Sequence, residues 1–296
     1  MQGFARSDLA VECGVGQEIK GVSVRECEAG GCGIVRVHVR TPEAAERIGK
    51  PVGRYVTVEC GDIRMLDENE SERVRCALAV EIREMAERMS GKRIGKDFSL
   101  LVVGLGNAEI TPDAVGPQVV RRLSVTRHLR RLDNALFSTV GLCEIAAVCP
   151  GVLGQTGLEA VELVRGAVRA SSPDLVIAID ALAARAVARL ATTVQLADTG
   201  IRPGSGIGNA RRALDEGSLG VPVMALGVPT VVDSSTLVAD ALEQAGYREP
   251  DERLLRVLRS GKSFFVSPKE IDLLVSSVGA LLADSLEKAF GVVNES

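Results

Sequence analysis

Residues 99–117 read SLLVVGLGNAEITPDAVGP, and this stretch decides the fold. It starts with an apolar run without alternation, which is typical of a strand covered by helices on both faces. The run ends in the turn-forming residues Gly104, Gly106 and Asn107 and leads on to Asp113. Because function in an open parallel sheet gathers at the carboxyl ends of the strands, Asp113 is a candidate site residue.

Two further apolar runs repeat this pattern along the chain. Residues 175–179 (LVIAI) end at Asp180, and residues 221–226 (VPVMAL) end at Gly227. Helical stretches lie between the runs, including one over residues 156–170. This alternation predicts an α/β fold with a mostly parallel sheet that helices cover on both faces.

The N-terminal third has a different texture. Residues 34–39 and 55–60 alternate apolar and polar side chains, which predicts an antiparallel β region over 22–60. A helix is expected over 69–89, with Gly91 as its stop, and a last helix over 268–290, with Ser267 and Glu270 as a capping box. We therefore expect a single α/β domain over 1–296, with an N-terminal β region plus helix at 20–97, a catalytic α/β core at 98–245 and a C-terminal helix at 267–291.

Composition excludes several classes of function. The formal charge is -4, which argues against a nucleic-acid binder that works by overall charge. The two histidines, His38 and His128, are too few for a site with several His ligands. The seven cysteines form no CxxC pair, which fits a reduced intracellular compartment. No apolar stretch reaches the length of a membrane span, and the first residues do not read as a secretory signal.

The two strand-end carboxylates could work as a pair. Asp113 and Asp180 are separated by one or two βα units, so both could face one cleft. Two close carboxylates cannot both ionise easily, and a pair that shares a proton can activate water for hydrolysis. Each Asp could instead be a turn residue or a helix cap. Asp198 and Asp233 also follow strand-like runs, and Asp233 is more easily explained as the cap of a helix that starts near Ser234.

Three short motifs that would indicate another function are each incomplete in this sequence. Glu109 stands where a dinucleotide fingerprint needs its third glycine, Arg256 stands where a phosphate loop needs its first, and Pro203 breaks a GxSxG elbow. Backbone amides of two glycine-rich loops could still cradle an anion, which leaves a non-enzymatic anion- or nucleoside-binding module as an alternative. The loop candidates are Gly104, Gly106, Asn107, Gly204, Ser205, Gly206 and Asn209.

Longer strings of the sequence resemble a known family. VVGLGNAEITPDAVGP, SVTRHL, PGVLGQTGLE, PDLVIAIDALAAR, TTVQLADTGIRPGSGIGN and GVPVMALGVPTVVD, together with RSDLAVE near the start, are similar to the germination protease of spore-forming bacteria. The resemblance is dense over residues 99–240. It implies an endopeptidase that degrades small acid-soluble spore proteins early in germination, in the cytoplasm of the spore core.

The resemblance also implies site residues and partners. The family is an atypical aspartic protease, and its two catalytic aspartates map onto Asp113 and Asp180. The implied fold is phosphorylase/hydrolase-like and is shared with the metal-dependent hydrogenase maturation endopeptidases, whose chemistry is a second alternative. Neither His38 nor His128 follows a matching strand, so we expect no metal and no cofactor. The implied partners are the spore proteins as substrates and further copies in a homotetramer, with neither nucleic acid nor membrane.

Members of this family are made as zymogens with a short propeptide ahead of the RSDLAVE-like string. Here residues 1–4 precede Ala5, and they are a candidate minimal or remnant propeptide. Phe4 and Ala5 pair an apolar with a small residue, as in the family's cleavage sites, although Gly3 replaces the usual Glu. The resemblance therefore predicts autoprocessing between Phe4 and Ala5.

Overall fold

The structure is a computed structural model of the chain. It describes residues 7–13, 19–204, 211–247, 253–254, 256–257 and 264–292. The predictions for Phe4, Ala5, Ser205, Gly206 and Asn209 therefore lie outside the described residues.

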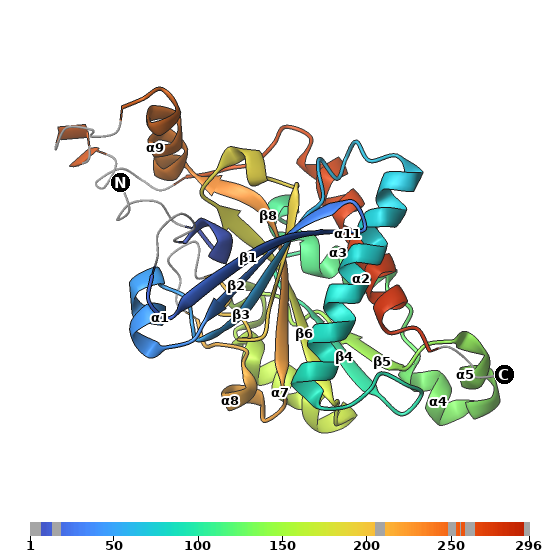
Figure 1. The fold of residues 1–296 in the computed structure, drawn as a ribbon. Helices are drawn as coiled ribbons and strands as arrows, with labels where there is room; N and C mark the ends of the chain where they lie inside the picture. The colour runs from blue at the N-terminus through green and yellow to red at the C-terminus, as the bar shows by residue number, and fades with distance from the viewer. Residues whose placement is uncertain are drawn as a thin grey trace.

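One mixed sheet of nine strands runs through the described part of the chain (Figure 1). Its order is β1-β2-β3-β7-β8-β6-β4-β5, and β9 pairs with β8. The strands are β1 (Val22–Ala29), β2 (Cys32–Val39), β3 (Gly53–Glu59), β4 (Ser99–Gly104), β5 (Glu144–Val148), β6 (Leu175–Ala184), β7 (Thr193–Ala197), β8 (Val223–Asp233) and β9 (Phe265–Val266).

The sheet has a parallel and an antiparallel half. Strands β5, β4, β6 and β8 are parallel neighbours, whereas β1, β2, β3, β7 and β8 pair antiparallel in turn, as do β8 and β9. The expected antiparallel N-terminal region is confirmed. The expectation of a mostly parallel sheet holds only for four strands, because β7 runs against β8 and joins both halves into one sheet.

Helices cover both faces of the sheet. One face packs against α2 (Glu68–Ser90), α3 (Val115–Arg122) and α11 (Ile271–Ala289), which lie together on one side (Figure 1). The other face packs against α1 (Pro42–Ile48) at its antiparallel end and against α7 (Ala160–Ser171) and α8 (Glu216–Leu219) at its parallel end. The remaining elements are α4 (Arg127–Leu132), α5 (Asn134–Val140), α6 (Leu153–Thr156) and α9 (Ser234–Gln244), with three short turns, η1 (Ala10–Glu12), η2 (Thr111–Asp113) and η3 (Val187–Arg189).

Local chemistry sets most of the helix ends. Asp67 and Glu70 form a capping box at the start of α2, and Gly91 ends that helix in a left-handed conformation, as predicted. Asp233 caps α9, also as predicted. The predicted capping box at Ser267 is wrong, because α11 begins after Glu270 and no side chain of the described residues caps it.

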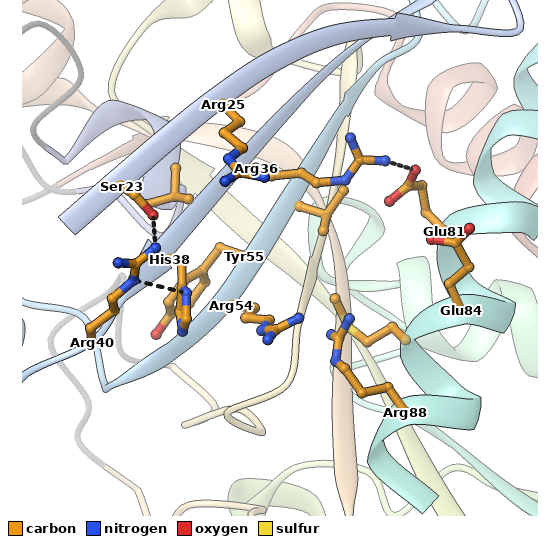
Figure 2. A pocket seen from close by; sticks show the side chains of 13 residues that line it. Ser23, Arg25, Arg36, His38, Arg40, Arg54, Tyr55, Glu81, Glu84 and Arg88 are labelled. Carbon is orange, nitrogen blue, oxygen red and sulfur yellow. Dashed lines mark hydrogen bonds and ion pairs between the residues drawn. The ribbon is translucent and has the colours of Figure 1, made fainter. Parts of the chain in front are cut away.

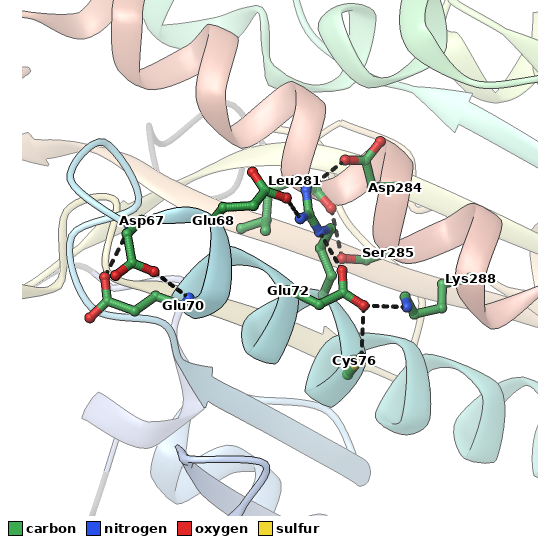
Figure 3. A network of polar contacts seen from close by, with 10 residues as sticks. Asp67, Glu68, Glu70, Glu72, Cys76, Leu281, Asp284, Ser285 and Lys288 are labelled. Atoms are coloured by element: carbon green, nitrogen blue, oxygen red, sulfur yellow. Dashed lines mark hydrogen bonds and ion pairs between the residues drawn. The ribbon is translucent and has the colours of Figure 1, made fainter.

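The longest helices, α2 and α11, are tied together by charge (Figure 3). Lys288 Nζ lies 2.6 Å from Glu72 Oε1, and Arg75 Nη1 lies 3.2 Å from Asp284 Oδ2. Lys288, Glu72 and Asp284 are about half exposed and only Arg75 is mostly covered, so the apolar contacts beneath these pairs contribute most of the packing free energy. Among the helices that the structure describes, none combines the length and apolarity needed to cross a bilayer.

Candidate active site

The strand geometry brings the two predicted aspartates into one cleft of about 930 Å³, although not in the expected way. We expected Asp180 to end its strand, but β6 continues through Asp180 to Ala184. Strand β4 is the one that stops, since Gly104 is its last residue and pairs with Ile179. Asp180 therefore lies one residue beyond the end of the pairing between β4 and β6, while β8 still pairs with β6 on the other side.

Asp113 reaches the same cleft from the turn after β4. Its Oδ2 accepts a 2.7 Å hydrogen bond from the Asn107 backbone N–H, which folds the loop back on itself. Thr230, fully buried on β8, donates to the carbonyl of Pro112 at 2.7 Å and so fixes the residue before Asp113. The short turn is thus fixed by two hydrogen bonds, one to the Asp113 carboxylate and one to the backbone just before it.

The glycines of the GLG string serve this turn sterically. A Cβ on Gly106 would lie 1.9 Å from the Asp113 carbonyl oxygen, and its φ is +104°. A Cβ on Gly104 would lie 2.5 Å from the Gly116 carbonyl oxygen. Both positions require the absence of a side chain because the loop packs against the backbone that carries Asp113. The Asn107 amide, an expected anion donor, already binds the Asp113 carboxylate.

The two carboxyl groups sit in different environments. Asp180 is buried, and burial raises its pKa well above the ordinary range, with repulsion from Asp113 and then Asp8 adding to the shift. Asp113 is half-buried, and burial raises its pKa too, but the Asn107 N–H and the positive charge of Arg211 oppose the rise. The environment therefore favours the proton on Asp180.

One wall of the cleft is the N-terminal segment Ser7–Cys13. The backbone N–H of Asp8 donates to the Ala183 carbonyl and the Ala183 N–H donates to Asp8 Oδ2, both at 2.9 Å. Glu12 accepts from the backbone N–H groups of Arg185 and Ala186. The segment thus covers the edge of β6 that β4 leaves open.

Two side chains clamp this segment in place. Gln195 of β7 accepts from the Ala10 N–H at 2.6 Å and donates to the Asp8 carbonyl at 3.0 Å. Lys50 Nζ donates to the carbonyls of Ser7 and Asp8 at 3.1 and 3.0 Å. Each clamp binds backbone groups, so the position of the segment does not depend on its own side chains alone.

The other expected site residues are placed as follows. Gly106 and Gly204 line the cleft. Asp198 does not lie there; it follows β7, accepts from the Arg54 N–H at 2.7 Å and lies 3.8 Å from an Arg88 nitrogen. Within the described residues, neither histidine lines the cleft, and no group of three or more His, Cys, Asp or Glu side chains could hold a metal ion.

Comparison with known proteins shows to which family this chain belongs. A sequence profile described as germination protease matches residues 6–246. The chain belongs to the germination protease family. Germination protease of Bacillus subtilis (strain 168) is 46% identical over 251 residues, which are 82% of this chain and 67% of that protein.

Two relatives outside Bacillus match over more of the chain. Germination protease of Caldanaerobacter subterraneus subsp. tengcongensis is 40% identical over 309 residues, covering 96% of this chain and 93% of that protein. Germination protease of Clostridium perfringens (strain ATCC 13124) is 35% identical over 318 residues, covering 96% and 94%. The resemblance read from the motifs is confirmed, and the protein is a spore germination endopeptidase.

Sequence reasoning missed several residues that build the site. Asp8, Lys50, Gln195, Arg211 and Thr230 all line the cleft. Gln195 and Thr230 did carry a signal, because each is a polar residue inside an otherwise apolar strand run. Lys50 carried none, since its role depends on how α1 packs beside the N-terminal segment.

Proposed function

We propose that this germination protease cleaves small acid-soluble spore proteins in the spore core, with Asp113 and Asp180 as its catalytic pair. The observation that carries the proposal is the convergence of two carboxyl groups in one cleft, one from β6 and one from the turn after β4, where repulsion from Asp113 helps to raise the pKa of Asp180. The class of substrate follows from the family resemblance. No cofactor enters the proposal.

The two aspartates take different roles. Asp180, the more deeply buried group, enters the reaction protonated because its pKa is raised furthest. Asp113 enters as the carboxylate, because its shallower burial raises its pKa less than that of Asp180 and the Asn107 N–H favours its ionised form; Arg211 lowers the pKa of both groups. This assignment makes Asp113 the general base and Asp180 the general acid.

Hydrolysis then proceeds with balanced proton transfers. Asp113 takes a proton from water as the water oxygen attacks the scissile carbonyl carbon, and Asp180 gives its proton to the carbonyl oxygen. The product is an uncharged tetrahedral gem-diol. Asp113 next protonates the leaving nitrogen, the C–N bond breaks, and a gem-diol hydroxyl returns its proton to Asp180. The enzyme ends in its starting protonation state.

The shape of the cleft suits an unfolded substrate. Its volume of about 930 Å³ lies in the size range of ligand clefts, and its lining includes Asp180–Ala183, the part of β6 beyond the end of β4. An extended peptide can enter such a cleft without the unfolding that a globular substrate would require. Small spore proteins that lack stable structure fit this requirement.

Autoprocessing between Phe4 and Ala5 is part of the same proposal. Ser7 lines the cleft, and extended chain geometry puts residue 4 no more than about 11 Å of chain away from it. We also propose, from the resemblance alone, a homotetramer, which sedimentation equilibrium tests. Intact-mass spectrometry tests the cut, and a cut that persists in Asp113→Asn would assign it to another protease.

Removal of either carboxylate tests the catalytic pair. Asp113→Asn and Asp180→Asn should each lower kcat/KM on a purified spore protein by on the order of 10³-fold or more, because an amide cannot exchange the proton. The double variant should be hardly worse than either single variant, since the two groups act as a unit.

Asp198→Asn provides the matched control. It makes the same chemical change at an aspartate outside the cleft, and it should retain cleavage within about threefold of the parent. Near-normal activity in either cleft variant would remove that residue from the mechanism. Loss of activity on chelation, restored by one divalent metal, would favour the maturation-protease chemistry instead.

A further inference from the structure

A second cavity, of about 350 Å³, lies on the face of the sheet opposite the catalytic cleft (Figure 2). It forms between the outer strands β1, β2 and β3 and the C-terminal half of α2. The face is assigned by alternation along β3, because Val56 packs into the core beneath α2 whereas Tyr55 packs on the side of the N-terminal segment. We refer to this cavity as the arginine groove.

The groove is strongly cationic within a chain whose formal charge is -4. Five arginines line it against two glutamates, Glu81 and Glu84. The positively charged residues and the neighbouring histidine are Arg25, Arg36, Arg40, Arg54, Arg88 and His38.

Only part of this charge is used inside the protein. Arg36 pairs with Glu81, whose side chain is only 5% exposed. Arg40 bonds neutral partners, with its Nε 3.3 Å from His38 Nδ1 and a terminal nitrogen 3.2 Å from Ser23 Oγ. These contacts orient two of the arginines, and the five arginines of the lining still outnumber its two glutamates by three.

Arg54 and Arg88 are the two cations that extend toward the middle of the groove from β3 and α2 (Figure 2). Within the described residues, the guanidinium of Arg54 has no carboxylate within ion-pair distance. The nearest carboxylate oxygen to Arg88 is Asp198 Oδ2, at a long 3.8 Å, and Asp198 already accepts from the Arg54 backbone N–H.

The positive charge of Arg54 also affects two neighbouring groups. Burial lowers the pKa of His38, and the charges of Arg54 and Arg40 lower it further. Burial also lowers the pKa of Arg88, with repulsion from Arg54 as the next cause. An anion seated between Arg54 and Arg88 would relieve both repulsions.

We propose that the arginine groove binds a phosphate group of a small molecule, held between the guanidinium groups of Arg54 and Arg88. Planar guanidinium forks match the oxygens of a phosphate in bidentate geometry. A phosphate monoester carries a charge of about −1.5 to −2 near pH 7 and has three acceptor oxygens. A carboxylate carries a single negative charge and has two acceptor oxygens. A groove with several unbalanced cations therefore suits phosphate better than a single carboxylate.

The groove offers little to the rest of such a ligand. Among the described residues of its lining, Tyr55 is the one with a phenyl ring, and it is only 3% exposed and directs its hydroxyl to the Pro51 carbonyl. A base would therefore find no such ring on which to stack. Recognition should depend on the phosphate and not on a nucleoside attached to it.

Isothermal titration of the intact protein with pyrophosphate, in a chloride buffer, tests the proposal. Arg54→Gln and Arg88→Gln should each weaken pyrophosphate binding about tenfold or more, because each removes charge-assisted hydrogen bonds. Arg93→Gln removes the same charge from an exposed position outside the groove and should change binding less than about twofold.

Thermal unfolding without ligand separates binding from a structural role. Removing one of two cations that repel each other should leave the Tm unchanged or raise it. If the groove is a ligand site, Arg54→Gln and Arg88→Gln should therefore bind pyrophosphate more weakly without a fall in Tm. Weaker binding accompanied by a clear fall in Tm in both variants would instead assign Arg54 and Arg88 a structural role and overturn the proposal.

Three further probes identify the ligand chemistry. Inorganic phosphate should compete with pyrophosphate, and ADP should bind within about threefold of pyrophosphate. Binding of ADP more than about tenfold tighter would contradict recognition of the phosphate alone. Saturable binding of a polyglutamate peptide without phosphate binding would assign the groove to an acidic protein partner, and no saturation by any probe up to about 10 mM would overturn the site.

Discussion

The central strands and the outer strands of this sheet place ionisable side chains in different environments. Strands β4, β6 and β8 are buried on both faces, and Asp180 in β6 has its pKa raised well above the ordinary range by that burial. Strands β2 and β3 are buried in their middles, but Arg25, Arg36 and Arg54 stand at exposed or half-buried positions of the outer strands and line one groove. Full burial favours the neutral form of a carboxyl group, whereas a position at the border of the buried layer leaves a cation in contact with water.

Buried uncharged polar groups differ in their partners. Thr230 and Gln195 are buried in strands of the sheet interior, and each is bonded to the backbone that shapes the catalytic cleft. Thr193 is also buried, at the start of β7, but its hydroxyl has no hydrogen-bond partner among the described residues. Its hydrogen bond, and not burial alone, therefore gives Thr230 a role in shaping the cleft.

The largest effect is expected at Gly106. In Gly106→Ala the new Cβ would lie 1.9 Å from the Asp113 carbonyl oxygen, and the backbone at φ +104° disfavours any L side chain. The turn must move, so we expect a loss of about 3 kcal/mol or more in the free energy of unfolding and nearly complete loss of cleavage. Urea unfolding and kcat/KM measure the two effects.

Gly91→Ala is the matched substitution outside the site. Gly91 also has a positive φ, +66°, but a Cβ added there would meet no atom of the described residues within 4 Å. It should cost only about 1 kcal/mol and leave cleavage unchanged. Equal losses at Gly106 and Gly91 would show that backbone conformation, and not the close approach to Asp113, accounts for the effect.

Removing a buried hydroxyl should change the free energy of unfolding in opposite directions at Thr230 and at Thr193. Thr230→Val leaves the buried Pro112 carbonyl without its donor, and should cost about 1–3 kcal/mol and lower kcat as the Asp113 turn loosens. Thr193→Val removes a buried hydroxyl that has no partner in the described part of the chain, and should be neutral or stabilising. Thermal unfolding of the pair decides this, and destabilisation of the same size in both would remove the special role of Thr230.

These contrasts also explain what the sequence could predict. Unalternating runs identified β4, β6 and the first part of β8, because burial on both faces demands apolar residues. The same runs could not show where β6 ends, since Asp180 interrupts the apolar pattern and the strand continues beyond it. The aspartate that seemed to end a strand is instead a residue inside one.

The site was predictable only where chemistry and strand position coincide. Asp113 and Asp180 met that condition, and the cleft contains both. Asp198 met it as well, yet its carboxylate lies elsewhere: its neighbours Ala197 and Thr199 line the cleft, whereas Asp198 binds the Arg54 N–H and lies beside Arg88. Which way a side chain beyond a strand end turns depends on its tertiary partners, so a pattern of apolar residues could not reveal it.

The protonation of Asp180 has a consequence for stability. Because its folded pKa lies above its unfolded value, the folded state loses stability as pH rises from about 4 through the folded pKa. Each unit of elevation corresponds to about 1.4 kcal/mol once the group is ionised. Asp180→Asn avoids this penalty, so it should unfold at a higher temperature than the parent at pH 8 and at nearly the same temperature at pH 4.

Thermal melts of parent and Asp180→Asn across this pH range provide the measurement. A Tm difference for Asp180→Asn that is constant with pH would mean that Asp180 keeps its charge in the folded protein, and the roles of the two aspartates would then be exchanged.

The smallest effect is expected where the two regions are tied together on the surface. Helix α2 packs against the outer strands and α11 packs beside α3, and Glu72 and Lys288 connect the two helices at 2.6 Å with both side chains nearly half exposed (Figure 3). Solvent screening weakens such an exposed pair. A double-mutant cycle of Glu72→Gln and Lys288→Met should give a small favourable coupling at low salt and a smaller one at about 1 M salt, where the Debye length falls to about 3 Å. A large coupling that does not change with salt would show that this surface pair holds the two regions together, and that the apolar contact between α2 and α11 contributes less than its burial indicates.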